Sequence, residues 1–190
     1  MSHQRKSKII THKDEYETPK WLFDLLDQEF HFDCDAAAST PKKTSEGFYT
    51  PSNSKCGYFL TDALLTDWGS IDIPRRHEDL RFFLNPPYSA AKIYAFMQKA
   101  YEESRKGALV VCLVPCATDT RWWHNYAMKA QEIRFIKGRV RFVGYDEDGK
   151  QVQNSPMFSS CVVIFDDDRA VNCSGRPFIG KTIDSAKKVK

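Results

Sequence analysis

Short apolar runs alternate along this chain with segments whose apolar residues recur at helical spacing. The runs are too short for helices and end at turn residues, so they predict buried strands, at 30–35, 58–61, 80–84, 109–114, 133–143 (broken by Gly138) and 159–165. Helical spacing, with three or four positions between apolar residues, begins at 18, 89 and 118. The order of these elements predicts an α/β fold, a mostly parallel sheet with an antiparallel end strand.

Two of the predicted helices carry local signals. Thr18 and Pro19 are typical of an N-cap followed by proline at the first helical position. In the third helix, Trp122 and Trp123 are adjacent and cannot both face the core of one helix. We therefore expect one of them to pack and the other to cover a pocket or groove.

The elements divide the chain into one domain and two polar ends. We expect a flexible basic lead at 1–13, a single domain at 14–168 and a basic C-terminal tail at 169–190. Within the domain, 40–58 and 69–79 are polar and contain proline, which predicts long loops. Loops of that length in a small domain are more often functional than idle.

Composition indicates a soluble globular protein. The chain has 190 residues, 42% hydrophobic and 28% charged, enough for one sizeable core. No stretch approaches the roughly 18 apolar residues of a membrane helix, and the N-terminal residues lack the apolar run of a signal peptide. We therefore expect a cytoplasmic location and no membrane partner. A net charge of +3 permits nucleic-acid binding without arguing for it.

Six cysteines are present, without a C-x-x-C pair or an H-E-x-x-H motif. We therefore expect no metal site. Cys34, Cys112 and Cys161 lie in apolar runs and are expected to be small core residues of a reduced, intracellular protein.

The sequence Asn85-Pro86-Pro87-Tyr88 follows the 80–84 run and precedes a helix, so it lies where open α/β sheets bind ligands. The following proline pushes Asn85 toward an extended conformation, and neither proline has an N–H. The predicted result is a stiff turn that presents the Asn85 side-chain oxygen, backbone carbonyls and the Tyr88 ring.

Such a turn suits a flat base with an exocyclic amine. Adenine N6 is a poor nucleophile, because its lone pair is delocalised into the ring. Two acceptors that take its N–H groups would favour a tetrahedral nitrogen, so the turn would act by positioning and electrostatics. A base in a duplex must be flipped out to reach it, and Tyr88 would then stack on it. The alternative is a purely structural strand-to-helix turn.

Segments along the chain match those of a known family, in the family's order, and together cover roughly residues 14–166. The matching segments are Glu17–Phe23, Phe32–Ser39, Leu60–Leu64, Asp67-Trp68, Asn85–Ser89, Thr118–Trp122 with His124, Arg134–Arg139 and Arg141-Phe142. The chain resembles the phage-type DNA N-6-adenine-methyltransferase (Dam) family. The resemblance implies a single-domain Rossmann-like, S-adenosylmethionine-dependent methyltransferase that modifies adenine N6 in double-stranded DNA. It implies a bacterial or phage-encoded enzyme, and we infer no metal and no obligate protein partner.

The resemblance also implies roles for individual residues. Asn85, Pro86, Pro87 and Tyr88 match the catalytic turn. The residues that match the methyl-donor site are Thr18 and Pro19 over the methionine carboxylate, Asp35, Ala36, Ala37 and Ser39 around the methionine part, Asp62 near the donor's adenine and Leu64 on that ring. Three alanines and a serine here replace the glycines of the usual first turn.

Simpler interpretations of three donor residues stay open. Asp35 could cap the helix that follows it, Asp62 could be an ordinary turn residue, and Thr18 could serve only as an N-cap.

Arg139 and Arg141 lie two positions apart, on one face of a predicted strand, with Val140 and Phe142 on the other. A solvated strand face is the simple explanation. In a DNA enzyme the same face is expected to lie along phosphates, and Arg121, Arg134 and Lys137 would extend it.

Other functions are compatible with the turn. The same chemistry could act on cytosine N4, RNA adenine or a protein side-chain amide, because the turn suits any planar amine. A catalytically weak nucleic-acid-binding module is a further alternative, which the intact turn disfavours. Target recognition is expected from the loops near 40–58, 69–79 and 144–157.

Overall fold

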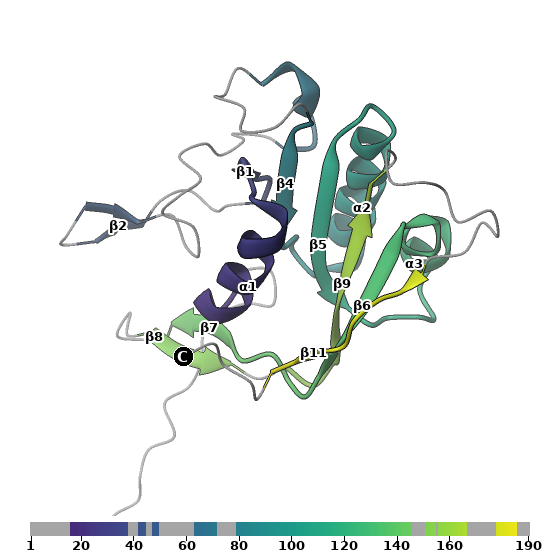
Figure 1. Ribbon diagram of the computed structural model, residues 1–190. Coiled ribbons are helices and arrows are strands. Elements are labelled where there is room, and N and C mark those ends of the chain that lie inside the picture. The colour runs from purple at the N-terminus through teal and green to yellow at the C-terminus, as the bar shows by residue number, and fades with distance from the viewer. Residues whose placement is uncertain are drawn as a thin grey trace, which may run out of the picture.

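The computed structural model describes residues 16–37, 42–44, 47–49, 63–71, 79–145, 151–154, 156–166 and 178–185. The helices are α1 (Lys20–Phe30), α2 (Ala90–Ser104) and α3 (Arg121–Asn125), with 3₁₀ turns η1 (Trp68–Ser70) and η2 (Ala127–Lys129). The strands are β1 (Cys34–Asp35), β2 (Lys42–Thr44), β3 (Gly47–Tyr49), β4 (Arg81–Leu84), β5 (Leu109–Pro115), β6 (Glu132–Lys137), β7 (Phe142–Tyr145), β8 (Gln151–Asn154), β9 (Ser160–Phe165), β10 (Phe178–Ile179) and β11 (Ile183–Asp184). Figure 1 shows their arrangement.

The central sheet is mixed and mostly parallel, as expected. Its order is β1-β4-β5-β9-β6-β10, and β11 also pairs with β6. The pairings of β1 with β4, of β4 with β5, and of β10 and β11 with β6 are parallel. The strand expected at 58–61 lies outside the described residues.

The antiparallel strand is not at the end of the sheet, which corrects our expectation. β9 pairs antiparallel with both β5 and β6 and so lies between them. All six residues of β9 are buried, and a strand this apolar needs neighbours on both sides. Part of the segment expected to be a tail, 178–185, instead supplies β10 and β11, which cover β6.

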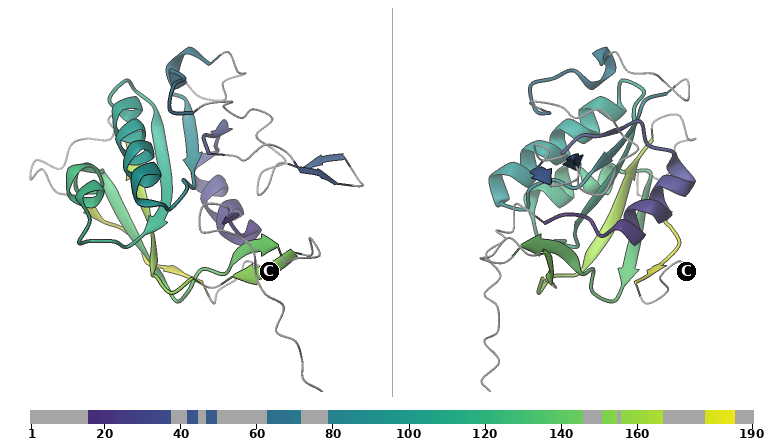
Figure 2. Two further views of the ribbon diagram at one scale, coloured as in Figure 1. Left: turned by 180° about the vertical axis from the view of Figure 1, so that it is seen from behind. Right: turned by 90° about the vertical axis from the view of Figure 1, so that its left-hand side faces the viewer.

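Helices cover both faces of the sheet. Figure 2 shows α1 on one face and α2 with α3 on the other. The apolar face of α1 is buried, and its Phe23 ring meets Phe83 of β4 edge-on at 5.2 Å between centroids. On the other face, α2 buries Ile93, Met97 and Ala100. The seven residues of β5, all buried, form the centre of the core.

Three local expectations need correction. Pro19, not Thr18, occupies the N-cap of α1, and no side chain caps that helix. Trp122 and Trp123 are both only 4% exposed, so both pack against the core, with their rings edge to face at 5.6 Å; Trp122 also lines a cavity, as expected for one of the two. The strand after Glu132 stops at Lys137, where Gly138 has φ +86°, so Arg139 and Arg141 lie outside strands.

The buried cysteines behave as expected. Cys34, Cys112 and Cys161 are buried in β1, β5 and β9 and form no disulfide within the described residues. Burial raises the pKa of the Cys112 thiol well above its ordinary value. These thiols therefore contribute to the core as small apolar groups.

Candidate active site

The Asn85–Tyr88 turn leaves the carboxyl end of β4 and leads into α2, whose N-cap is Ser89. Because β1, β4 and β5 are parallel neighbours, their carboxyl ends lie at one edge of the sheet. In Figure 1 the β7–β8 hairpin and the start of α1 also lie at this edge. An antiparallel bridge between Glu17 and Val143 joins those two segments. The edge is thus enclosed by segments that are distant in sequence.

Both ends of the Asn85 amide are hydrogen-bonded. Its Nδ2 donates to the carbonyl oxygen of Tyr16 at 2.7 Å, and its Oδ1 accepts from the Tyr88 hydroxyl at 2.7 Å. The Tyr88 hydroxyl lies 3.1 Å from the Leu113 carbonyl oxygen as well. Burial raises the pKa of Tyr88 well above its ordinary value, so the hydroxyl remains a donor. The amide oxygen that we expected to face a substrate amine is therefore held by Tyr88.

An aromatic cluster surrounds this turn. Tyr16 stacks on Phe142 at 5.4 Å between ring centroids, and the Tyr88 ring meets Phe142 and Phe158 edge-on at 6.0 and 5.4 Å. Tyr88 is only 9% exposed. Tyr16 and Phe158 were missed by the sequence reasoning, because neither lies in an element whose period marks it.

A cavity of about 1160 Å³ opens beside the turn. Its walls come from the turn, the first half of α2, the segment after β5 and the start of α3. Its lining residues are Tyr88, Ala90, Ala91, Ile93, Tyr94, Pro115, Ala117, Asp119, Thr120, Arg121, Trp122 and Phe158. A largely apolar and aromatic wall with a few polar groups is typical of a small-molecule or base site.

Thr18 and Pro19 are buried, and they follow Tyr16, whose carbonyl binds Asn85. The Thr18 hydroxyl oxygen has no hydrogen-bond partner among the described residues, although the side chain is only 4% exposed. A buried hydroxyl without a partner is costly. Because Thr18 caps no helix, a ligand at this position would relieve that cost.

Asp35 ends β1, next to β4, and is 6% exposed. Burial raises its pKa to about 7, an effect that the N–H of Ala37 at 3.1 Å partly offsets. Ala36 is buried, and its N–H donates to the Phe83 carbonyl. A carboxylate in this setting is well placed to bind a cationic group, whose charge would favour the ionised form.

The other predicted donor residues are less informative. Leu64 is described and 37% exposed, whereas Ser39 and Asp62 lie outside the described residues. The residues present fit the methyl donor that the resemblance implies. An unpartnered hydroxyl at Thr18 suits its carboxylate, and the buried Asp35 suits its ammonium or sulfonium charge.

The arginines proposed for DNA separate into two groups. Arg121, Arg139 and Arg141 are exposed; Arg121 lines the cavity, and Arg139 donates to the Pro156 carbonyl at 2.9 Å. Arg134, by contrast, is only 6% exposed. It makes ion pairs with Glu29 of α1 and with Glu132, both at 2.7 Å. Arg134 therefore belongs to the protein interior, which corrects its expected place along phosphates.

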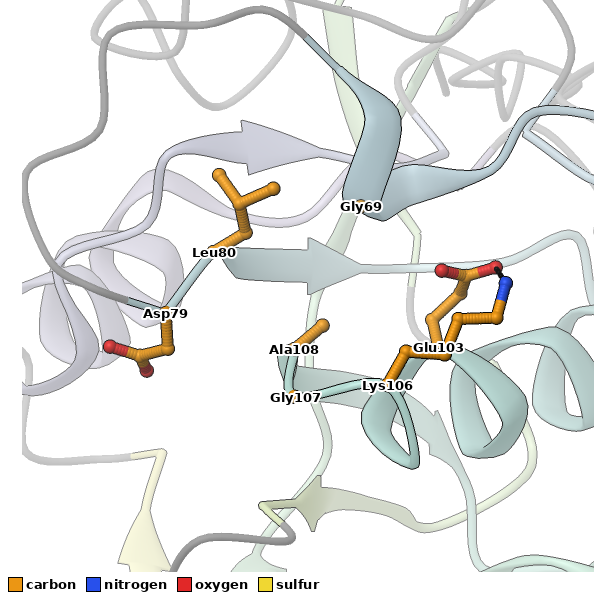
Figure 3. A pocket seen from close by; sticks show the side chains of 7 residues that line it. All are labelled: Gly69, Asp79, Leu80, Glu103, Lys106, Gly107 and Ala108. Carbon is orange, nitrogen blue, oxygen red and sulfur yellow. Dashed lines mark hydrogen bonds and ion pairs between the residues drawn. The ribbon is translucent and has the colours of Figure 1, made fainter.

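Figure 3 shows a smaller cavity, of about 160 Å³, at the opposite edge of the sheet. Leu80 and Ala108 directly precede β4 and β5, so this cavity lies at the amino ends of those strands. Glu103 lines it and pairs with Lys99 at 2.5 Å and with Lys106 at 3.0 Å. It is remote from the Asn85–Tyr88 turn and forms no part of that site.

The described residues contain no group of three or more His, Cys, Asp or Glu side chains placed to hold a metal ion. No helix in the described part of the chain is long and apolar enough to cross a membrane.

Comparison with known proteins agrees with the resemblance seen in the sequence. The model of the DNA N-6-adenine-methyltransferase (Dam) family matches residues 5–174. A DNA N-6-adenine-methyltransferase of Escherichia phage T1 is 28% identical over 144 residues, which are 75% of this chain and 52% of that protein. This chain thus spans about half the length of that relative. No solved structure matches the chain. Because the family match covers most of its length, the chain belongs to the DNA N-6-adenine-methyltransferase (Dam) family.

Proposed function

We propose that this protein transfers a methyl group from S-adenosylmethionine to the N6 amine of adenine in double-stranded DNA. The target base would be flipped out of the duplex into the cavity beside Asn85–Tyr88. Family membership supports the reaction and the acceptor. The observation that carries the proposal is the Asn85 amide, an oriented acceptor that is hydrogen-bonded to Tyr88, a residue on the wall of an aromatic cavity.

Asn85 would act by orientation. The Tyr16 carbonyl already holds its Nδ2, which leaves Oδ1 directed at the position that the Tyr88 hydroxyl occupies. A substrate N–H can replace that hydroxyl at the same acceptor, and the Tyr88 ring can then lie against the base. The two N–H groups of the amine would be taken by Asn85 Oδ1 and by a backbone carbonyl of the turn, since neither proline offers an N–H.

The turn supplies no general base, because an amide and a carbonyl are not basic enough to remove a proton. Its contribution is to orient the nitrogen lone pair and to stabilise charge that develops on the N–H groups. S-adenosylmethionine, when bound, supplies an electrophilic methyl group on a cationic sulfur. Thr18 would donate to its carboxylate, and Asp35 would balance its positive charge. The proton released from N6 would pass to water.

Transfer of labelled methyl groups tests this function. The protein is incubated with labelled donor and, separately, with duplex DNA, single-stranded DNA, RNA and bulk protein, and each product is digested to its components. We expect label in N6-methyl-2′-deoxyadenosine from duplex DNA. Label in N4-methyl-2′-deoxycytidine, in RNA or in protein would replace the proposed acceptor with another planar amine.

The matched variant is Asn85→Ala. It removes the acceptor for the amine but none of the groups assigned to the donor, so we expect loss of transfer with donor affinity unchanged. Loss of donor binding would mean that Asn85 belongs to the donor site instead. Absence of transfer to every acceptor by the wild-type protein would favour a nucleic-acid-binding module.

A further inference from the structure

A hydrogen-bonded group of side chains joins α3 to α2 next to the proposed base pocket. Asn125 Nδ2 donates to the Tyr94 hydroxyl oxygen at 3.0 Å, and the Tyr126 hydroxyl donates to the same oxygen at 3.3 Å. The Tyr94 and Tyr126 rings meet edge-on at 5.3 Å. Figure 2 shows α2 and α3 together on one face of the sheet.

This arrangement leaves Tyr94 with a proton to donate. A phenolic oxygen accepts two hydrogen bonds and donates one, and both accepting positions of Tyr94 are used. No acceptor takes its proton among the residues that the structure describes. A ligand that binds here must therefore present a hydrogen-bond acceptor.

Two cations lie near the Tyr94–Tyr126 pair: Arg121 in the same cavity as Tyr94, and Lys129 over the Tyr126 ring, outside that cavity. The Lys129 ammonium is 5.0 Å from the centroid of the Tyr101 ring and 5.9 Å from that of Tyr126. Arg121 lines the cavity together with Tyr94. Hydrogen bonds from Tyr126 and Asn125 lower the pKa of Tyr94, and the charges of Arg121 and Lys129 lower it further. Within the described chain, Arg121 and Lys129 form no ion pair.

The position of this group suggests what the acceptor is. Tyr94 and Arg121 line the same cavity as Tyr88. A nucleotide flipped into that cavity stays attached to its neighbours, so its phosphates must pass along the cavity wall. Tyrosine hydroxyls, arginine and lysine are among the groups that contact phosphates in protein–DNA complexes. The Tyr94 donor and the Arg121 and Lys129 cations match this partner, and Asp119 is the acidic side chain in the cavity lining.

We infer that Tyr94, Arg121 and Lys129 bind the DNA phosphates that flank the flipped nucleotide. The inference rests on the proposed function and adds a second DNA contact, apart from Arg139 and Arg141. Asn125 and Tyr126 act as positioning residues, because they occupy the accepting side of the Tyr94 oxygen and direct its proton outward. If this group served only to pack α3 on α2, it would need neither two cations without an ion pair nor a Tyr94 hydroxyl proton without an acceptor.

Salt dependence of duplex DNA binding tests the inference, measured by fluorescence anisotropy with S-adenosylhomocysteine present. Each phosphate contact contributes about −0.9 to the slope of log K against log salt. We expect Arg121→Gln and Lys129→Gln each to reduce the slope by about one. Tyr94→Phe removes a neutral donor, so affinity should fall about tenfold at an unchanged slope.

Two controls keep the test specific. Lys106→Gln removes one exposed positive charge at the opposite edge of the sheet, remote from the Asn85–Tyr88 turn, and should leave the slope unchanged. Arg121→Lys keeps the charge and should retain the wild-type slope even where α3 is perturbed. Wild-type slope and affinity in Tyr94→Phe, Arg121→Gln and Lys129→Gln would overturn the inference.

The outcome separates this inference from the proposed function. Altered slopes without methyl transfer by the wild-type protein would leave the phosphate site in place and reject the enzyme. Methyl transfer to duplex DNA with unaltered slopes and affinities would support the enzyme and reject the phosphate site.

Discussion

Replacing Tyr88 by Phe separates the two roles of that side chain. The ring keeps its contacts with Phe142 and Phe158, while the hydroxyl loses its hydrogen bonds to Asn85 and Leu113. Because both acceptors lie in a part-buried or buried setting, an unmet acceptor costs about 1–3 kcal/mol. We expect a loss of stability of that size, or roughly 2–12 °C in Tm for a chain of this length.

The effect of Tyr88→Phe on activity should be small. In the proposed reaction the substrate amine takes the place of the Tyr88 hydroxyl, so removing the hydroxyl also removes a competitor for Asn85 Oδ1. We expect kcat/KM on duplex DNA to change by less than about tenfold. Tyr88→Ala removes the ring as well, and loss of base stacking should lower kcat/KM about 5- to 150-fold.

The assays are urea unfolding for stability and methyl transfer to duplex DNA for activity, on wild type, Tyr88→Phe and Tyr88→Ala. Native stability in Tyr88→Phe together with a loss of activity beyond about 100-fold would refute the reasoning. That pattern would mean that the hydroxyl acts in the chemistry and does not simply hold Asn85 in the absence of substrate.

Further predictions concern charge. Burial raises the folded-state pKa of Asp35 from 3.8 to about 7. The free protein should therefore lose up to about 4 kcal/mol of stability as the pH rises between those values. Asp35→Asn should abolish that loss, measured by urea unfolding at pH 4 and pH 8. Because a cationic donor favours ionised Asp35, donor affinity by calorimetry should rise about tenfold from pH 6 to pH 8, and a flat profile would place the donor elsewhere. Arg134→Ala should lower stability by about 2–4 kcal/mol and leave the salt dependence of DNA binding unchanged. A weaker salt dependence in this variant would mean that Arg134 contacts DNA. Replacing both Arg139 and Arg141 by Ala should weaken the salt dependence of DNA binding, and an unchanged salt dependence would mean that neither arginine contacts DNA.

The strands β4, β5, β6 and β9, the three helices and the position of the Asn85–Tyr88 turn could be predicted because periodicity and turn residues report them locally. The run before Asn85 and the spacing after it predicted β4 and α2 within one or two residues. The alternation of exposure at 139–142 was also correct, with Val140 and Phe142 buried and the arginines exposed. Local burial thus follows from local sequence, even where no strand forms.

The remaining features depend on contacts between distant segments. The place of β9 between β5 and β6 is a matter of strand order, which no local pattern encodes. Arg134 looked like a surface charge because its partner Glu29 lies 105 positions away in the sequence. The Tyr16 carbonyl that orients Asn85 is backbone, so its role could not be predicted from residue type.

The central claim is that Asn85 holds the N6 amine of adenine for methylation, and premethylated DNA tests it most directly. Two duplexes of one sequence are prepared, one with adenine and one with N6-methyladenine at every adenine position. Labelled donor is supplied with wild type and with Asn85→Ala. We predict that wild type labels only the unmethylated duplex, and that Asn85→Ala labels neither while it still binds the donor. Equal labelling of both duplexes, or full labelling by Asn85→Ala, would contradict the claim.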